Sequence, residues 1–356
     1  MRDFLIIGGG IAGIVAAARL SELGRVTLLE AEAATGYHAS GRSAALYEPN
    51  YGLPPVVELS RASGEGLRAA GVLSPRGMML LGCAGEEAVF DADLAGMNLA
   101  EIEVAAAIGR VPVLNPEVVT RAAVGSHAED IDTDLWMQTL LKAARANGAE
   151  ILTGAAVSAL ARVPGGWQAV TAAGTHEGRQ LVNAAGAWAD TVAAMAGVAG
   201  LGLVPHRRSV ARIAAPGGLD VSGWPMIFGA GEGWYAKPDA GALIVSPAEE
   251  EPMAPMDAWP EDMMLAEGLA RWQAVSTVEV TRPISSWAGL RTFAPDRVLV
   301  IGADPRAEGL WWMAGQGGYG FQTSAGAGAL LADLVAGHAP ALPAATVAAL
   351  SPARLT

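Results

Sequence analysis

The sequence predicts an α/β fold, and three observations lead to this prediction. The chain has 356 residues, so we expect two domains or one large α/β unit. Hydrophobic residues make up 52% and charged residues 17% of the chain, which is enough to bury a sizeable core and excludes a disordered or fibrous protein. Short apolar segments typical of buried strands also alternate with helical segments and glycine-rich turns.

Two apolar segments with a helical segment between them open the chain. Residues 4–7 and 26–29 have the composition of strands that are buried on both faces, and residues 14–23 form an alanine-rich helical segment closed by Gly24. A glycine-rich turn, residues 8–13, joins the first strand to the helix. This order is that of a Rossmann-type βαβ unit, whose turn binds the phosphates of a nucleotide.

The glycines of this turn and the acid after the second strand each have a physical role. Gly8 allows the tight turn, Gly10 lets the backbone approach a pyrophosphate, and Gly13 lets the helix and the strand pack closely. The helix N-terminus directs a partial positive charge toward that phosphate. Glu30 can accept hydrogen bonds from both ribose hydroxyls and repels a 2′-phosphate, which disfavours NADP and leaves FAD or NAD.

Residues 36–45 are mostly small and form a loop along which a ligand can pass close to the backbone. Further strands are expected at residues 180–188, 297–302 and 310–314. A second glycine-rich turn, residues 315–320, precedes a helix that we predict for residues 321–335, and backbone N–H groups at such a helix start favour a negative ligand group. A reduced flavin carries negative charge near N1 and its O2 carbonyl, so this turn suits a reduced flavin.

The charge and the rarer residue types exclude several classes of function. The net charge of −13 at pH 7 has the wrong sign for coating nucleic acid or an anionic membrane. Cys83 is the only cysteine, which excludes an internal disulfide and a cysteine metal cage, and we expect it to be a buried, inert thiol. The five histidines show no metal-ligand spacing, so we expect no metal. The only lysines are Lys142 and Lys237.

The sequence shows no uninterrupted apolar segment of the length that crosses a membrane, which is about 18 residues. Residues 4–20 are apolar but contain four glycines and lead into structured sequence, so we do not interpret them as a signal peptide. We therefore expect a cytoplasmic protein, a monomer or a small homo-oligomer, with neither a membrane span nor a nucleic-acid partner.

Several separate stretches of the chain resemble the D-amino acid oxidase-like flavoenzymes, a group that includes glycine oxidase and sarcosine oxidase. Within that group the chain is most similar to the bacterial FAD-dependent D-arginine dehydrogenases. Besides the first glycine-rich turn with Glu30, the stretches that carry the resemblance are GYHASGRSAA (36–45), LSPR (73–76), DIDTD (130–134), HRRS (206–209), WYAKPDAG (234–241) and SSWAGLR (285–291).

The resemblance implies a bound, non-covalent FAD and a set of residues around it. The residues that it assigns to the cofactor are Gly8, Gly10, Ile11, Ala12, Gly13, Glu30, Ala31, Gly41, Arg42, Ser43, Ala44, Ala45, Val157, Ala185, Gly186, Trp188, Gly317, Gly318, Tyr319, Gly320 and Gln322. Cys83 matches no attachment motif for a covalent flavin.

The resemblance also implies two interleaved domains. A Rossmann-type FAD-binding domain would comprise residues 1–69, 130–200 and 292–356, and an α+β substrate domain, built on a mostly antiparallel sheet that covers the flavin, would comprise residues 70–129 and 201–291. The sequence itself supports this division, because short strand candidates bounded by Pro and Gly fall in the second domain, at residues 208–214, 225–228, 234–236 and 242–246.

Periodicity and composition predict three further segments. Residues 134–147 have the spacing of a helix that buries Trp136, Leu140 and Ala143 on one face. Residues 261–274 also have the pattern of a helix. The acidic, Met-rich and Pro-interrupted residues 247–262 are typical of a solvated loop.

Arginine is the residue best suited to planar, bidentate binding of a carboxylate. By the resemblance, Arg291 and Arg208 hold a substrate carboxylate, and Tyr235 and Tyr51 donate hydrogen bonds beside them. Strand alternation places only one of Arg207 and Arg208 inward, and the sequence leaves open which one. Each arginine could instead be a surface ion-pair residue, and Tyr51 a generic loop aromatic.

The resemblance implies oxidative deamination of a D-amino acid. Hydride would pass from Cα of a neutral amine to flavin N5, and the imino acid would hydrolyse to a 2-oxo acid and ammonia, so no protein base is required. The electron acceptor, a quinone, another carrier or O₂, stays open. Neither Lys142 nor Lys237, which we place in a turn, matches the lysine of the sarcosine-oxidase group, which favours a dehydrogenase.

Other functions on the same fold also stay open. They are a glycine or sarcosine-type amine oxidase, a 2-hydroxy acid dehydrogenase, and a flavoprotein that tailors a larger molecule such as a modified nucleoside. The acidic net charge weighs against the last of these.

Two positions of the side-chain pocket differ from those of the D-arginine dehydrogenases. Where that group is expected to have a carboxylate after the Ser-Pro-Arg stretch, this chain has Met78, and Leu46 replaces a polar residue. A buried guanidinium without a counter-charge is costly, so we expect an apolar side chain in the substrate. The alternative is that another acid, such as Glu48, supplies the missing charge.

Overall fold

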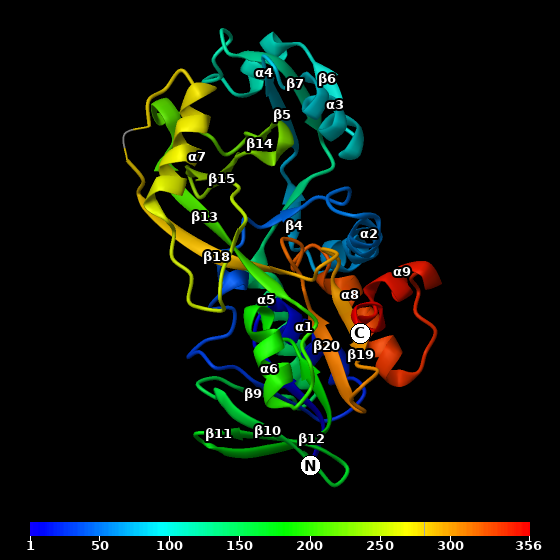
Figure 1. The fold of residues 1–356 in the computed structure, drawn as a ribbon. Helices are drawn as coiled ribbons and strands as arrows, with labels where there is room; N and C mark the ends of the chain where they lie inside the picture. The colour runs from blue at the N-terminus through cyan, green and yellow to red at the C-terminus, as the bar shows by residue number, and fades with distance from the viewer. Residues whose placement is uncertain (281) are drawn as a thin grey trace.

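The computed structural model describes residues 1–280 and 282–356, which fold around two large sheets (Figure 1). The first sheet has the strand order β10-β11-β12-β1-β2-β9, with β20 paired to β12 and β19 paired to β20. Its strands are β1 (Arg2–Ile7), β2 (Val26–Leu29), β9 (Glu150–Leu152), β10 (Val157–Val163), β11 (Gly166–Thr171), β12 (Gly174–Asn183), β19 (Val300–Ala303) and β20 (Leu310–Ala314).

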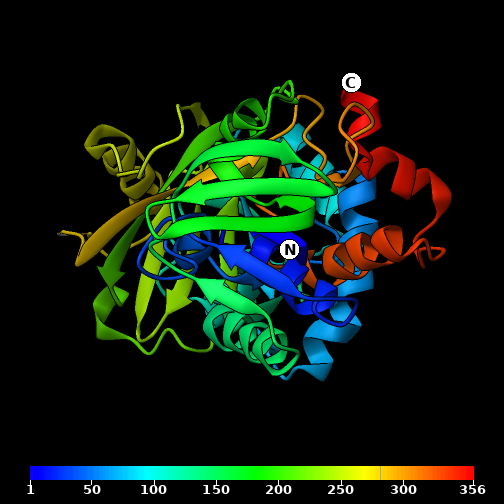
Figure 2. The same cartoon turned by 90° about the horizontal axis from the view of Figure 1, so that it is seen from below.

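The centre of the first sheet is parallel and covered on both faces. Strands β20, β12, β1, β2 and β9 run parallel, while β10, β11 and β19 are antiparallel to their neighbours. Because both faces are covered, β2 is buried along its whole length, and its residues other than Thr27 are apolar. Figure 2 shows the green strands β10, β11 and β12 from below, nearest the viewer.

The helices cover the rest of the molecule. One face of the first sheet carries α1, which packs against α5 and α8, and α8 also packs against α2. The other face is covered by α6 together with β10 and β11. The helices are α1 (Ile11–Leu20), α2 (Pro54–Ala69), α3 (Glu87–Gly96), α4 (Val104–Arg110), α5 (Thr133–Ala146), α6 (Ala189–Met195), α7 (Asp262–Ala274), α8 (Ser324–Ala336) and α9 (Ala344–Leu350).

The second sheet has the order β17-β13-β16-β15-β14-β5-β7-β6, with β18 paired to β13. Every pair is antiparallel except β14 with β5, so the predicted α/β fold with a mostly antiparallel second sheet is confirmed. Its strands are β5 (Met78–Cys83), β6 (Ala100–Ile102), β7 (Val119–Gly125), β13 (Val204–Ala214), β14 (Met226–Gly229), β15 (Tyr235–Asp239), β16 (Ala242–Ser246), β17 (Glu251–Pro252) and β18 (Ser285–Phe293).

Three short strands form a small third sheet, separate from the two large ones. It consists of β3 (Leu46–Tyr47), β8 (Glu129–Ile131) and β4 (Leu73–Pro75), with β8 in the centre. The first sheet uses strands from residues 1–69, 130–200 and 292–356, and the second uses strands from residues 70–129 and 201–293. We propose the two-domain division along these sheets.

Several local expectations need correction. In α5, Trp136 and Leu140 are buried but Ala143 is exposed, because Leu141 and Ala144 complete the buried face. Lys237 lies inside β15 rather than in a turn, since Pro238 is accommodated near the end of that strand.

Residues 247–262 are not only a solvated loop: they contain β17 and pass close to residues 36–45. The helix predicted for residues 321–335 begins at Ser324, after a turn. The helix predicted for residues 261–274 is confirmed as α7.

Glycine makes the contact between β1 and α1 possible. Gly8 has a φ of +106°, and a Cβ at Gly13 would lie 1.8 Å from the Gly8 carbonyl oxygen. Helix α1 ends at Leu20, earlier than predicted, and Gly24 does not form a left-handed cap. Gly24 instead makes room for Asp3, whose Cβ would be 2.9 Å from a Cβ at residue 24.

Among the residues that the structure describes, no helix combines the length and the apolar character that a membrane crossing requires.

The contact at Gly13 gives a first prediction. Gly13→Ala should lower the free energy of unfolding by about 1–3 kcal/mol, because the added methyl group overlaps the Gly8 carbonyl and forces β1 and α1 apart. The control is Gly109→Ala in α4, where nothing lies within 4 Å of the added Cβ, so its stability should be unchanged or up to about 1 kcal/mol higher. Denaturant unfolding measures both, and equal effects would contradict the account.

Candidate active site

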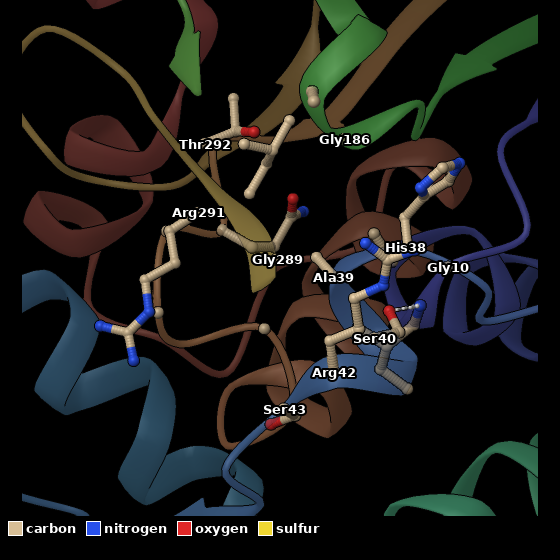
Figure 3. Close-up of a pocket in the computed structure, with 18 of the residues that line it drawn as sticks. Gly10, His38, Ala39, Ser40, Arg42, Ser43, Gly186, Gly289, Arg291 and Thr292 are labelled. Atoms are coloured by element: carbon tan, nitrogen blue, oxygen red, sulfur yellow. Dashed lines mark hydrogen bonds between the residues drawn. The ribbon is translucent and has the colours of Figure 1, made fainter. Parts of the chain in front are cut away.

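One cavity of about 490 Å³ lies at the carboxyl ends of the parallel strands and reaches the second sheet (Figure 3). Ile7 and Gly8 line it at the end of β1, Leu29 and Glu30 at the end of β2, and Ala184 after β12. In open α/β sheets, ligands bind outside the carboxyl ends of the strands. The position of this cavity is therefore that of a nucleotide site with room for a second ligand.

Most of the residues that the sequence singled out line this cavity. They are Gly8, Gly10, Ile11, Ala12, Glu30, Ala31, Arg42, Ser43, Ala44, Ala45, Leu46, Tyr51, Met78, Val157, Ala185, Gly186, Trp188, Arg208, Tyr235, Arg291, Gly317, Gly318, Gly320 and Gln322.

Three of the assigned residues lie behind the wall of the cavity. Gly13 packs α1 against β1, as described above. Gly41 lets residues 36–45 close on themselves, since a Cβ there would lie 2.5 Å from the Gly36 carbonyl oxygen. Tyr319 packs against Tyr51, with 5.2 Å between the ring centroids. These three residues support residues that line the cavity.

The nucleotide end of the cavity is organised by Glu30. Its Oε2 accepts a hydrogen bond from the backbone N–H of Gly9 at 2.6 Å, and its Oε1 accepts one from the backbone N–H of Glu32 at 2.8 Å. The carboxylate is buried and its remaining lone pairs can accept hydroxyl donors. This acceptor set fits the ribose of a dinucleotide. Gly10 also lines the cavity, where the absence of a side chain lets the backbone approach a pyrophosphate.

Residues 36–45 are held in place by two polar contacts. Ser40 Oγ accepts a hydrogen bond from the backbone N–H of Ile11 at 2.9 Å, which occupies one of the free donors at the start of α1 (Figure 3). Arg42 donates to the carbonyl oxygens of Ala258 and Ala288, each at 2.8 Å, and pairs with Asp257. The hydrogen bond from Arg42 lowers the pKa of the Asp257 carboxyl. Arg42 thus ties this loop to residues 247–262 and to β18.

Arg291 projects from β18 into the cavity and lies over Gly318, where a Cβ would be 3.0 Å from its Nη1 (Figure 3). Among the described residues, no side chain or carbonyl accepts a hydrogen bond from its guanidinium, and no carboxylate lies within 4 Å of it. Desolvation by the protein surroundings of Arg291 lowers its pKa, but the nearby Tyr51, Tyr235 and Glu232 raise it by more, so that the pKa lies above the ordinary arginine value. Arg291 therefore presents a full positive charge with open donors.

The structure distinguishes the two neighbouring arginines of β13. Arg208 lines the cavity, while Arg207 points to the other side of the sheet and pairs with Glu251. Arg208 donates to the carbonyl oxygen of Glu249 at 2.9 Å and to Glu250 at 3.1 Å. Burial and then the charge of Arg291 lower its pKa from the ordinary arginine value.

The two tyrosines differ in their bonding. Tyr51 donates its single hydroxyl proton to Glu232 Oε2 at 2.8 Å, and burial, reinforced by Glu232, raises its pKa. Tyr51 can donate to a ligand only if it leaves Glu232. The hydroxyl of Tyr235, at the start of β15, makes no hydrogen bond with any residue that the structure describes, so it is available to a ligand.

Several cavity residues were not found from the sequence. Ser40 and His38 lie in the loop already identified, but their contacts depend on how that loop folds. Glu232 and Met97 come from segments that carry no motif, and only the folding of the second sheet brings them to Tyr51 and Met78. Glu232 has a positive φ of 54°, an unusual local feature that the sequence does not reveal.

The lysines and the cysteine lie away from the cavity wall. Lys142 is exposed on α5. Lys237 is buried and donates a hydrogen bond to Asp130 Oδ1 at 2.7 Å, and the other carboxylate oxygen of Asp130 accepts one from Arg76. Cys83 is half-buried rather than fully buried, and burial raises the pKa of its thiol. None of these three residues lines the cavity.

The cavity has a glycine-rich βαβ turn and a ribose acceptor at one end and two arginines at the other. These features are those of a dinucleotide-dependent oxidoreductase. Residues 3–334 match the model of the family described as FAD dependent oxidoreductase (DAO). The chain belongs to this family, and FAD is its cofactor. Bound FAD supplies a two-electron acceptor at this site.

Curated relatives match over part of their length. D-amino acid dehydrogenase 2 of Ralstonia nicotianae is 47% identical over 62 residues, which are 17% of this chain and 14% of that protein. Hydrogen cyanide synthase subunit HcnC of Pseudomonas aeruginosa is 30% identical over 210 residues, which are 57% of this chain and 48% of that protein. Thus neither match covers as much as half of the relative.

Solved structures match over the whole chain. Glycine oxidase from Geobacillus kaustophilus superposes with a TM-score of 0.83 at 24% identity, covering 100% of this chain and 98% of that one. L-amino acid deaminase from Proteus vulgaris superposes with a TM-score of 0.80 at 18% identity, covering 99% of this chain and 97% of that one. At these identities the likeness shows the fold.

The role of Glu30 gives a second prediction. Glu30→Ala, and independently Gly10→Val, should yield protein with little bound flavin, because the first removes the ribose acceptor and the second places a side chain in the path of the pyrophosphate. The absorbance of flavin relative to that of protein measures occupancy. The control is Glu22→Ala, an exposed acid that follows α1, which should keep its flavin. Full occupancy in Glu30→Ala would contradict this assignment.

Proposed function

We propose that the protein oxidises a D-amino acid with an apolar side chain to the imino acid, which hydrolyses to a 2-oxo acid and ammonia. The observation that carries this proposal is the guanidinium of Arg291, which lines the cavity, half-buried, with open donors and no ionic partner among the described residues. A guanidinium with open donors can form charge-assisted, bidentate hydrogen bonds with an anion, so the cavity favours an anionic ligand group at this point. The carboxylate of an amino acid meets that need.

The chain's own residues would bind and orient the substrate. Arg291 would bind the carboxylate, Arg208 would add a second positive charge, and Tyr235 would donate its free hydroxyl. Tyr51 would join them after leaving Glu232. Because these groups hold the carboxylate of the substrate, they also fix the position of its Cα and its amine. Positioning of the reacting atoms can supply a large part of the rate enhancement without a protein base.

The side-chain end of the cavity supports an apolar substrate. Met78, Phe228 and Met97 form a buried apolar cluster against which Leu46 packs, and all four line the cavity. Methionine adapts its shape to different apolar partners. D-leucine, D-methionine and D-phenylalanine fit such a wall, whereas a guanidinium placed there would lose its hydration.

The D-configuration and the acceptor rest on separate observations. The relative that is 47% identical over 62 residues is a D-amino acid dehydrogenase, whereas one of the structural neighbours is an L-amino acid deaminase. A dehydrogenase is favoured over an oxidase because neither Lys142 nor Lys237 lines the cavity. We propose a non-covalent FAD, since Cys83 does not line the cavity either.

The second candidate is an amine oxidase of the glycine type, which the likeness to glycine oxidase favours. Its substrate has the same carboxylate, so Arg291 would bind it in the same way. The two candidates differ in the use of the apolar wall, which glycine would leave empty, and in peroxide release during turnover.

Arginine substitutions give a third prediction. Arg291→Met should lower kcat/KM for flavin reduction about 10²-fold or more, since a charge-assisted hydrogen bond contributes about 1.5–3 kcal/mol. Arg208→Met should act in the same direction. Arg207→Met is the matched control, because its side chain faces Glu251 outside the cavity, and its effect should be much smaller. Equal and small effects of all three would show that the carboxylate binds elsewhere.

Substrate preference gives a fourth prediction. At pH 7, kcat/KM for D-leucine should clearly exceed that for D-arginine, because Met78 and Leu46 offer a guanidinium no counter-charge. Steady-state kinetics with an artificial electron acceptor measure both values. A clear preference for D-arginine would overturn the apolar assignment and leave the class of enzyme intact, and faster turnover of glycine than of either would favour the second candidate.

A further inference from the structure

We infer that Glu48, on the wall of the cavity, and His127, which lies behind it, form a proton-sharing pair. This pair makes the choice between apolar and cationic substrates depend on pH. The inference deepens the proposed function and rests on it. Near neutral pH, while the pair holds one proton, it carries no net charge and the cavity selects apolar side chains. When the pair loses its proton, Glu48 becomes an unbalanced carboxylate that favours a cationic side chain.

The position of Glu48 is unusual for an acid. It follows β3, lines the cavity and is 2% exposed. Its Oε1 accepts a hydrogen bond from the backbone N–H of Asn50 at 2.8 Å. Its Oε2 is fully buried and lies 2.8 Å from His127 Nε2, although the two groups are not oriented for a hydrogen bond. Neither atom has another hydrogen-bond partner among the described residues.

His127 is held beside Glu48 by a specific local arrangement. It lies between β7 and β8, and its ring packs where a side chain at residue 125 would be, since a Cβ at Gly125 would lie 2.6 Å from His127 Cε1. Leu99 lies against the same point. The histidine side chain is about one quarter exposed, so it can exchange its proton with solvent. The pair thus links a buried carboxyl to solvent.

The surroundings of the pair are mostly uncharged. Burial raises the pKa of Glu48 to about 7 and lowers the pKa of His127 below its ordinary value. Near Glu48 lie the phenols of Tyr47 and Tyr51 on its own segment, whose pKa values burial raises, and the amide of Gln322. Met78 from β5 and Met97 after α3 line the same cavity, as do the positively charged Arg208 and Arg291. Glu232, across the cavity, is bonded to Tyr51.

The two groups therefore share one proton near neutral pH. Whether that proton resides on Glu48 or on His127, the net charge of the pair is zero. Above the pH at which the pair loses it, the net charge is −1, and the charge faces the cavity wall where the substrate side chain would lie. A cationic side chain then gains an ionic partner, which removes the cost that makes it a poor substrate at lower pH.

The test is the ratio of kcat/KM for D-lysine to that for D-norleucine, measured from pH 6 to pH 9. The two substrates share the carboxylate and the α-amine, so ionisation at those groups cancels in the ratio. In the unmodified protein the ratio should rise about tenfold or more across this range, because the carboxylate forms a charge-assisted contact only when ionised. In Glu48→Gln the ratio should stay flat, since a neutral amide cannot supply that charge.

The matched control is Glu232→Gln, which removes a second carboxylate from the cavity wall. This carboxylate accepts a hydrogen bond from Tyr51 and is not paired with a histidine, so the ratio should still rise with pH in the variant. A flat ratio in the unmodified protein, or an equal rise in Glu48→Gln, would overturn the inference alone. If neither amino acid reduces the flavin, the proposed function fails and the inference with it.

A second readout does not depend on activity. Between the unfolded pKa near 4.5 and the folded pKa of about 7, Glu48 holds a proton in the folded protein that it has released in the unfolded chain. The folded protein therefore loses stability as the pH rises through this interval. Glu48→Gln should lack that loss, and its free energy of unfolding relative to the unmodified protein should increase across this interval. A constant difference would show that Glu48 is ionised throughout.

Discussion

The cavity depends on one electrostatic constraint, the positive charge of Arg291 held without an ionic partner. A buried guanidinium that bonded to a protein carboxylate would be neutralised and unavailable, and one in solvent would discriminate little. The strand β18 brings Arg291 to the space over Gly318, where a Cβ would lie 3.0 Å from the Nη1 atom of the guanidinium. We propose that this charge serves to bind a ligand.

The rest of the fold serves to bring this charge to the nucleotide site. The parallel centre of the first sheet places the β1 turn and Glu30 at one edge, and the second sheet carries Arg208 and Arg291 on the paired strands β13 and β18. Residues 36–45 fill the space between them, fixed by Arg42 to β18 and to residues 247–262. A single cavity therefore joins the residues that we assign to the FAD to Arg208 and Arg291.

The sequence predicted the parts of this arrangement that depend on local geometry. The turn of residues 8–13 follows from glycine spacing, and its βαβ unit is present in the structure. Strand alternation limited the choice between Arg207 and Arg208 to one of them, but the hydrogen-bond partners that decide it, Glu249 and Glu251, lie about 40 residues further along the chain. No local pattern could supply that information.

Residues that act through distant contacts were missed or misplaced for the same reason. Glu232 and Met97 enter the cavity only because the second sheet folds around it. The proline after Lys237 favours a turn, whereas the pairing of β15 with β16 keeps Lys237 within the strand. Its side chain then binds Asp130, more than a hundred residues away. The partner of Glu48 is likewise a histidine from a different strand connection, and the sequence indicated only that Glu48 could supply charge.

The most direct test of the central claim is anaerobic mixing of the purified protein with single D- and L-amino acids while the flavin absorbance is recorded. The account predicts rapid bleaching by D-leucine, little bleaching by L-leucine, and loss of the D-leucine response in Arg291→Met that retains its flavin. Unchanged bleaching in that variant, or no bleaching by any amino acid in the unmodified protein, would contradict it.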